Sequence, residues 1–343
     1  MRTTILSIDG GGTRGLFPAT ILKQLEIDLG KKVTEVFDII IGAATGGIIV
    51  SSIAGGLSME EIQHLYLTRA RDLLPKNSFR QFFLFNPLNL FRAKYSNDGL
   101  YQTLKYQIGD QKPMDDVFKE YGEQTIFLIP ALNLNPYLNA TDIPGFEPVV
   151  FNSVSNRDRN EKLIDIAMRT SAAAVNLPIY QQYGEGGNYA NDPSIFGVSF
   201  AMNDKIDHTG NSRLRNEKLG LARSPYDIRL LSIGCGSTGA SYVKEKHLRN
   251  PDWGLYKWQR YLISLVIDTN MVANQYLSRE ILPSENFLRI NAYYKDESAP
   301  EVLRSKKLKI DVVDPEQLNA IKTYAEDIYQ QNRTSILSFI NQL

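Results

Sequence analysis

The chain has 343 residues, 43% hydrophobic and 22% charged, a composition typical of a globular protein large enough to bury a substantial core. Its 38 Lys and Arg residues balance 38 Asp and Glu residues, so net charge does not direct the chain toward nucleic acid or an anionic membrane. The single cysteine, Cys235, excludes an internal disulfide framework and favours a reducing compartment.

Strands and helices alternate from the start of the chain. The segment "TTILSID" at 3–9 predicts a short strand, and residues 16–30 predict a helix with helical apolar spacing that ends at Gly30. Residues 35–42 form a nearly continuous apolar run, as expected of a central parallel strand covered on both faces, and a second helix follows. This order predicts an α/β fold, with a mostly parallel central sheet sandwiched by helices.

The rest of the chain extends the same pattern. Further strands are expected at 125–134 and 227–236, with the helix 162–174 between them. After Gly236 the pattern turns helical, with long helices expected over 255–282 and 315–343. We therefore expect a single domain, 1–343, with a core over about 1–240 and a helical C-terminal part over about 241–343.

A phenylalanine-rich, lid-like insertion interrupts the core at about 75–96. Its phenylalanines are Phe79, Phe82, Phe83, Phe85 and Phe91. One hypothesis is that they line an acyl channel or enter a membrane interface. The other, which we favour, is a lid packed on its own small core.

A glycine-rich turn joins the first strand to the first helix. Gly10, Gly11, Gly12 and Gly15 leave backbone N–H groups unobstructed beside a helix N-terminus, an arrangement that binds phosphate or stabilises an oxyanion. The spacing also matches the dinucleotide-binding motif G-x-G-x-x-G, but the second strand ends in small residues rather than in the acid that this motif requires. The oxyanion turn is therefore favoured over the nucleotide site and over a turn needed only for packing.

The second strand ends in a sequence with the shape of a nucleophile elbow, G-x-S-x-G. Within "FDIIIGAATGGIIV" (37–50), Gly42 and Gly46 are the small residues that an elbow requires, and Gly47 adds further room. The position of the nucleophile holds Ala44, which keeps the geometry but has no nucleophilic atom.

A serine at this position would need a base. The three histidines, His64, His208 and His247, lie in polar or basic surroundings far from any glycine-rich strand end, so we expect surface residues. Glu185 precedes two glycines in "YGEGGNYANDPS", where a carboxylate on a tight turn can accept a proton directly. No spacing typical of a metal site is present.

Together these segments resemble the patatin-like phospholipase family. Its motif D-G-G-G-x-[RK]-G is matched in full by residues 9–15, and G-x-S-x-G-G is matched except at Ala44. Its aspartate–glycine motif resembles "EGGNYANDP", with Glu185 in place of aspartate. The segments "YSNDGLYQTL", "RTSAAAVNLPIY", "LLSIGCGSTG" and "MVANQYLSREIL…FLRIN" are also similar to family segments, so the likeness covers nearly the whole chain.

The resemblance implies a lipid acyl hydrolase that uses a serine–acid dyad and needs no metal or other cofactor. It implies the following roles: nucleophile position, Ala44; general base, Glu185; oxyanion hole, Gly10, Gly11, Gly12 and Arg14; support of the elbow, Gly42, Gly46 and Gly47. The expected partner is a phospholipid or other acyl-ester lipid at a membrane surface, and no nucleic acid is expected. Some bacterial members are antiviral effectors switched on by cyclic nucleotides, which leaves open such an activator and a homo-oligomer, although no residue here argues for either.

Ala44 has two explanations. The chain is either a working hydrolase whose nucleophile was replaced, or a natural relative that lost catalysis and kept lipid binding. The intact glycines and Arg14 around the site favour the first explanation. Glu185 argues the other way, because its extra methylene moves the carboxylate by roughly 1.5 Å relative to aspartate.

The sequence also gives expectations about location. We find no basic, apolar secretory signal at the N-terminus and no window of the roughly 18 apolar residues that a membrane span requires. We therefore expect a cytoplasmic protein whose contact with a membrane is peripheral.

Overall fold

The computed structural model describes residues 2–74, 91–136, 145–239, 243, 245–249, 252–305 and 308–341. Within these residues one sheet has the strand order β4-β3-β2-β1-β6-β7, and β5 pairs with β3 beside this path. The strands are β1 (Thr3–Ile8), β2 (Ile39–Gly42), β3 (Ile126–Asn133), β4 (Glu147–Asn152), β5 (Tyr183–Gly184), β6 (Ile228–Ile233) and β7 (Phe287–Ile290). Only the pairings of β3 with β4 and β5 are antiparallel, which confirms the mostly parallel sheet.

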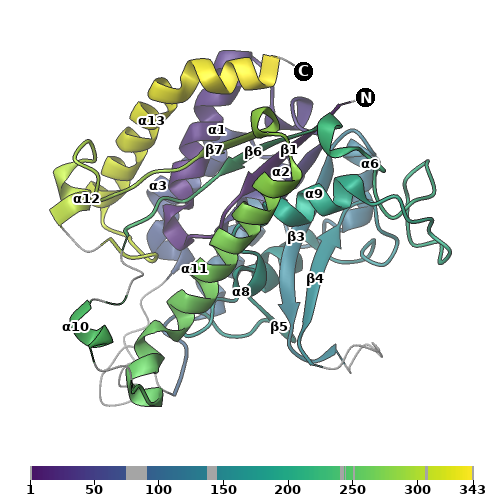
Figure 1. The fold of residues 1–343 in the computed structure, drawn as a ribbon. Coiled ribbons are helices and arrows are strands. Elements are labelled where there is room, and N and C mark those ends of the chain that lie inside the picture. The colour runs from purple at the N-terminus through teal and green to yellow at the C-terminus, as the bar shows by residue number, and fades with distance from the viewer. Residues whose placement is uncertain are drawn as a thin grey trace.

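Helices cover both faces of this sheet (Figure 1). On one face lie α1 (Leu16–Leu29), α2 (Thr45–Ala54), α3 (Met59–Leu73), α5 (Asn97–Ile108), α7 (Leu163–Thr170), α12 (Glu301–Ser305) and α13 (Pro315–Asn341). On the other lies α9 (Ser194–Met202), with α8 (Gly187–Ala190) and α11 (Leu255–Ile281) packed beside it. The remaining helices are α6 (Met114–Tyr121) and α10 (Glu245–Leu248). The expected sandwich of helices around a sheet is therefore confirmed.

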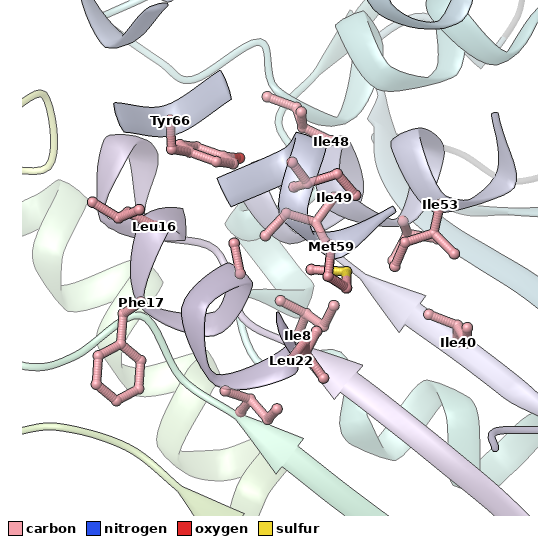
Figure 2. Close-up of a cluster of buried hydrophobic side chains, with 14 of the residues drawn as sticks. Ile8, Leu16, Phe17, Leu22, Ile40, Ile48, Ile49, Ile53, Met59 and Tyr66 are labelled. Atoms are coloured by element: carbon pink, nitrogen blue, oxygen red, sulfur yellow. The ribbon is translucent and has the colours of Figure 1, made fainter. Parts of the chain in front are cut away.

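The two faces of β1 build two separate hydrophobic cores. Successive strand residues point to opposite faces, so Leu6 and Ile8 enter the larger core while Ile5 enters the smaller one. Figure 2 shows Ile8 of β1 and Ile40 of β2 beneath side chains of α1 and α2. Both faces of β1 and β2 are buried, and β2 is accordingly apolar throughout, whereas β1 also buries the small polar side chains of Thr3, Thr4 and Ser7.

The C-terminal part contributes a strand as well as helices. β7 extends the sheet beside β6, with Phe287 opposite Leu230. α13 packs on α1, where Tyr329 Oη donates to Asp28 Oδ2 at 2.6 Å and Arg333 pairs with the same carboxylate. The C-terminal part therefore shares the sheet and the larger core with the rest of the chain.

Two sequence-based expectations need qualification. The apolar run at 35–42 begins as a 3₁₀ turn, Val33–Glu35, and becomes a strand only at Ile39. Most of the phenylalanine-rich segment, including Phe79, Phe82, Phe83 and Phe85, lies outside the described residues, whereas Phe91 is described and exposed. In the part of the chain that is described, no helix combines the length and the apolar character that crossing a bilayer requires.

Candidate active site

Ala44 lies at the tip of a strained turn between β2 and α2. Its backbone has φ 52° and ψ −118°, a conformation that L-residues rarely adopt and that marks functional turns. A Cβ at Gly46 would lie 2.2 Å from the carbonyl oxygen of Ile8, and one at Gly42 would lie 2.3 Å from that of Gly46. The strand and the helix can approach this closely only because these positions are glycine.

The backbone around Ala44 is held from two directions. The Ala44 N–H donates to Thr170 Oγ1 at 3.0 Å, and Thr170 is fully buried at the end of α7. On the other side, Thr45 Oγ1 and Tyr66 Oη lie 2.5 Å apart. The N-terminus of α2 begins at Thr45, so its positive dipole end points at the position of the nucleophile.

The glycine turn after β1 lies directly against the elbow. A Cβ at Gly10 would come within 3.1 Å of Ala44 Cβ, and the Gly10 N–H already donates to the carbonyl oxygen of Asn191 at 2.9 Å. In contrast, we find no acceptor for the N–H groups of Gly11 or Gly12 among the described residues. Of these two glycines, Gly12 lines the pocket around Ala44 and Gly11 does not.

Arg14 holds this turn from outside the pocket. Its Nε donates to the carbonyl oxygen of Gly11 at 3.3 Å and its Nη1 to that of Gly236 at 3.1 Å. With the Gly11 carbonyl fixed, the orientation of the neighbouring Gly12 N–H is also fixed, because both belong to one planar peptide. Arg14 does not line the pocket that contains Ala44.

A buried ion pair anchors the start of the same turn. Arg289 of β7 donates to both carboxylate oxygens of Asp9 and, at 2.6 Å, to Ser232 Oγ. A second carboxylate, that of Asp192, lies 3.5 Å from the same guanidinium. Burial raises the pKa of the Asp9 carboxyl, and the charge of Arg289 opposes this rise. The arrangement ties the glycine turn to β6, β7 and the start of α9.

Glu185 follows β5 and precedes α8. Its N–H donates to the carbonyl oxygen of Ala172 at 3.1 Å, and the next N–H, of Gly186, donates to the carbonyl oxygen of Thr170 at 3.1 Å. Burial without a charged partner raises the pKa of the Glu185 carboxyl to about 7. The carboxyl thus titrates near neutral pH, as a general base requires.

One pocket brings Ala44, Glu185 and Gly12 together. The other lining residues are mostly apolar: Thr13, Thr45, Ile48, Tyr66, Leu73, Leu74, Tyr95, Leu100, Ser171, Ala173, Asn176, Leu177, Ile310 and Asp311. None of the three histidines lines it. Among the described residues, no group of three or more His, Cys, Asp or Glu side chains is placed to hold a metal. The arrangement can hold an apolar chain beside a carboxylate and two backbone N–H donors.

A polar cluster borders this pocket. Asp311 accepts from Tyr95 Oη at 2.7 Å and pairs with Lys94. The same segment bonds to the glycine turn, because the carbonyl oxygen of Ile310 accepts from Thr13 N at 2.8 Å. The C-terminal part therefore supplies one wall of the pocket.

The fold and the site define an α/β protein with a nucleophile-elbow turn beside a glycine-rich turn. The chain belongs to the patatin-like phospholipase family, whose model matches residues 6–194. That match contains the glycine turn, the elbow and the Glu185 turn.

Relatives extend the likeness along the chain. A cGAMP-activated phospholipase of Escherichia coli is 28% identical over 327 residues, covering 88% of this chain and 83% of the relative. A cGAMP-activated phospholipase of Vibrio cholerae is 28% identical over 333 residues, covering 87% of this chain and 84% of the relative. Among solved structures, human GIVD cytosolic phospholipase A2 matches with a TM-score of 0.46 and 10% identity, covering 99% of this chain and 62% of that one.

Sequence reasoning missed several residues that hold the site. Thr170 lies in "RTSAAAVNLPIY", a segment similar to the family, but nothing in this segment predicts contact between its hydroxyl and the elbow. The backbone carbonyl oxygen of Asn191 accepts from the Gly10 N–H, and this contact does not involve the Asn191 side chain. Every residue has a backbone carbonyl oxygen, so a contact made by that atom cannot be predicted from the residue type.

Proposed function

We propose that this site is built to hydrolyse fatty-acyl esters of phospholipids through a serine–carboxylate pair whose serine position is occupied by Ala44. The observation that carries the proposal is the single pocket that Ala44, Glu185 and Gly12 line together. Its apolar walls suit an acyl chain, and membership of the patatin-like phospholipase family supports the same substrate class. The chain as it stands lacks the nucleophile and is expected to be inactive.

With serine at position 44, acylation would proceed by addition to the ester carbonyl and elimination of the alcohol. The serine Oγ attacks the ester carbonyl carbon while its proton passes to the Glu185 carboxylate. The negative charge that develops on the carbonyl oxygen is met by the N–H groups of Gly11, Gly12 and Thr45, the last being the first N–H of α2. When the tetrahedral intermediate collapses, the alcohol leaves with the proton held by Glu185.

Deacylation would reverse these roles. A water molecule gives a proton to the Glu185 carboxylate and attacks the acyl carbon, and the serine recovers that proton as the fatty acid departs. The acyl chain remains along the apolar wall formed by residues such as Ile48, Leu73 and Leu100. No step requires a metal ion.

Restoring the nucleophile tests this proposal. We expect Ala44→Ser to hydrolyse p-nitrophenyl esters of short fatty acids, at a rate at least about 10³-fold above the unchanged chain. Adding Glu185→Gln to Ala44→Ser removes the base and is expected to abolish the gain. A folded Ala44→Ser protein that is inert toward esters, yet binds lipid as the unchanged chain does, would favour the non-catalytic lipid-binding relative.

The names of the relatives support a further proposal, that a cyclic dinucleotide activates this chain. The E. coli and V. cholerae relatives named cGAMP-activated phospholipase align with most of the chain, including its C-terminal part. We expect cGAMP to raise the melting temperature, since a ligand that binds only the folded state stabilises it by RT ln(1 + [L]/Kd). It should also raise ester hydrolysis by Ala44→Ser, whereas a linear dinucleotide of the same bases should do neither.

A further inference from the structure

The N-terminal part of α11 presents apolar side chains to solvent. We call the following residues the α11 apolar end: Leu255, Tyr256, Trp258, Leu262, Ile263, Leu265 and Val266. Leu255 is 75% exposed and Tyr256 is 78% exposed, and no side chain described between 255 and 266 is buried. In Figure 1 this end of α11 extends beyond α8 toward α10. An apolar surface of this extent indicates an interaction site.

Aromatic residues gather at the same place. Trp253 lies edge-on to Trp258, with ring centroids 5.3 Å apart, and stacks on Tyr261 at 5.5 Å. These are the two tryptophans of the chain. Tryptophan and tyrosine favour the boundary between water and lipid, because their rings are apolar with a polar edge.

Charge favours a lipid surface over a second copy of the chain as the partner of the α11 apolar end. From Lys244 to Asp268 the sequence contains five basic residues and three acidic ones, a net charge of +2, although the chain as a whole is neutral. Pairing two copies through this end would bring like charges together, which opposes self-association. An anionic phospholipid surface supplies the complementary charge, worth about 1 kcal/mol per basic residue.

The other half of α11 is bonded to the backbone around the Glu185 turn. Asn270 Nδ2 donates to the carbonyl oxygens of Gly187 at 3.0 Å and Asn188 at 3.1 Å. One turn further, Asn274 Nδ2 donates to those of Tyr189 and Asp192, each at 3.1 Å. α11 is thus a continuous helix whose second half, although it also exposes apolar side chains such as Val272 and Tyr276, is bonded beside the proposed general base, whereas its first turns carry no buried side chain among those described.

We propose that the α11 apolar end docks on an anionic phospholipid surface, with its tryptophans at the headgroup level and Lys257 facing the lipid phosphates. This proposal extends the proposed function and depends on it only for the substrate class, because a phospholipid hydrolase must bind its substrate at such a surface. Docking would hold the rest of α11, and with it α8 and the Glu185 turn, at a fixed orientation to the lipid.

The unchanged chain tests docking without any hydrolysis. Because both tryptophans lie at this end, their fluorescence reports on it directly. We expect a blue shift and co-sedimentation with phosphatidylcholine vesicles that contain roughly a quarter phosphatidylglycerol, and weaker binding at high salt. Absence of both signals on these vesicles would overturn the proposal.

A matched set of variants locates the surface. The triple variant Leu262→Gln, Ile263→Gln and Leu265→Gln keeps good helix formers and is expected to weaken vesicle binding at least about tenfold. Tyr226→Gln removes an aromatic that is 79% exposed in the 3₁₀ turn Pro225–Asp227, outside α11, and should bind as the unchanged chain does. Thermal melts establish that both are folded, and a folded triple variant with unchanged binding would overturn the proposal.

Two further measurements distinguish vesicle docking from self-association and from failure of the proposed function. If sedimentation velocity shows a dimer that only the triple variant dissociates, while vesicles are not bound, the α11 apolar end is an interface between copies and the proposal falls. Hydrolysis of soluble short-chain esters by Ala44→Ser needs no vesicle. Its failure would count against the proposed function alone, whereas failure of vesicle binding with intact ester hydrolysis would count against docking alone.

Discussion

The hydroxyl of Thr170 accepts a hydrogen bond from the backbone N–H of Ala44 at 3.0 Å. The carbonyl oxygen of the same threonine accepts from the N–H of Gly186, the residue after Glu185, at 3.1 Å. One buried residue at the end of α7 therefore fixes both the position of the nucleophile and the turn of the proposed base. The separation of the two catalytic positions depends on this residue.

The first prediction concerns Thr170→Val in the Ala44→Ser background. The valine leaves the N–H of residue 44 without its acceptor, which costs about 1–3 kcal/mol of folding free energy. Because a misplacement of about 1 Å can cost 10²-fold in rate, we expect kcat to fall about 10- to 100-fold with KM little changed. Thr170→Ser keeps the hydroxyl and should restore most of kcat. Equal rates for the valine and serine variants would contradict a positioning role.

The second prediction concerns the pH dependence of stability. The Glu185 carboxyl has a pKa of about 7 in the folded chain against 4.5 as a reference. As pH rises from 4.5 to 7, the unfolded state loses this proton before the folded state does, so unfolding becomes more favourable. Glu185→Gln removes this penalty, and its free energy of unfolding should exceed that of the unchanged chain by about 3 kcal/mol at pH 8.

The same difference should vanish near pH 4, where the carboxyl is protonated in both states. Urea unfolding at both pH values measures it, with Glu280→Gln, at an exposed site on α11, as the matched control. A gain in stability that is the same at pH 4 and pH 8 would contradict the assignment. In the Ala44→Ser background, kcat/KM should rise with pH through about 7, as the base loses its proton.

Much of the fold follows from the sequence because its signals are local. The nearly continuous apolar run at 35–42 suits a strand buried on both faces, and together with the short strand predicted at 3–9 it predicted the centre of the sheet. Glycines spaced as in the elbow predicted a tight strand–helix turn, and Ala44 has the strained backbone that such a turn produces. The local sequence pattern was enough to predict the strands and the elbow turn, because each depends on neighbouring residues.

Contacts between distant segments were not predictable in this way. The wall of the pocket at Ile310 and the ion pair of Asp9 with Arg289 join residues roughly 300 positions apart, and no pattern in either segment specifies its partner. The resemblance implied a place for Arg14 in the oxyanion hole, but the residue type alone does not show whether such an arginine faces a ligand or binds backbone carbonyls. Its bonds to the carbonyls of Gly11 and Gly236 follow from tertiary packing.

The third prediction concerns the glycine that admits the elbow. A Cβ at Gly46 would lie 2.2 Å from the carbonyl oxygen of Ile8, a backbone atom that cannot move without distorting β1. We therefore expect Gly46→Ala to lower the free energy of unfolding by more than about 2 kcal/mol. At Gly254 an added Cβ meets nothing within 4 Å, so Gly254→Ala should leave stability nearly unchanged. Denaturant unfolding of the two variants compares them, and an equally small effect at Gly46 would contradict the close approach of α2 to β1.

The fourth prediction concerns the buried pair that anchors the glycine turn. Asp9→Asn leaves the guanidinium of Arg289, which is nine-tenths buried, facing a neutral amide and the more distant Asp192. Removing one partner of a buried ion pair typically costs about 3–5 kcal/mol, and Arg289→Met should cost a similar amount. The double variant removes both charges of the Asp9–Arg289 pair and leaves Asp192 without Arg289 just as Arg289→Met does, so it should be less destabilised than the sum of the single variants. Urea unfolding of all four proteins gives this coupling free energy, and simple additivity would mean that Asp9 and Arg289 hold the turn independently.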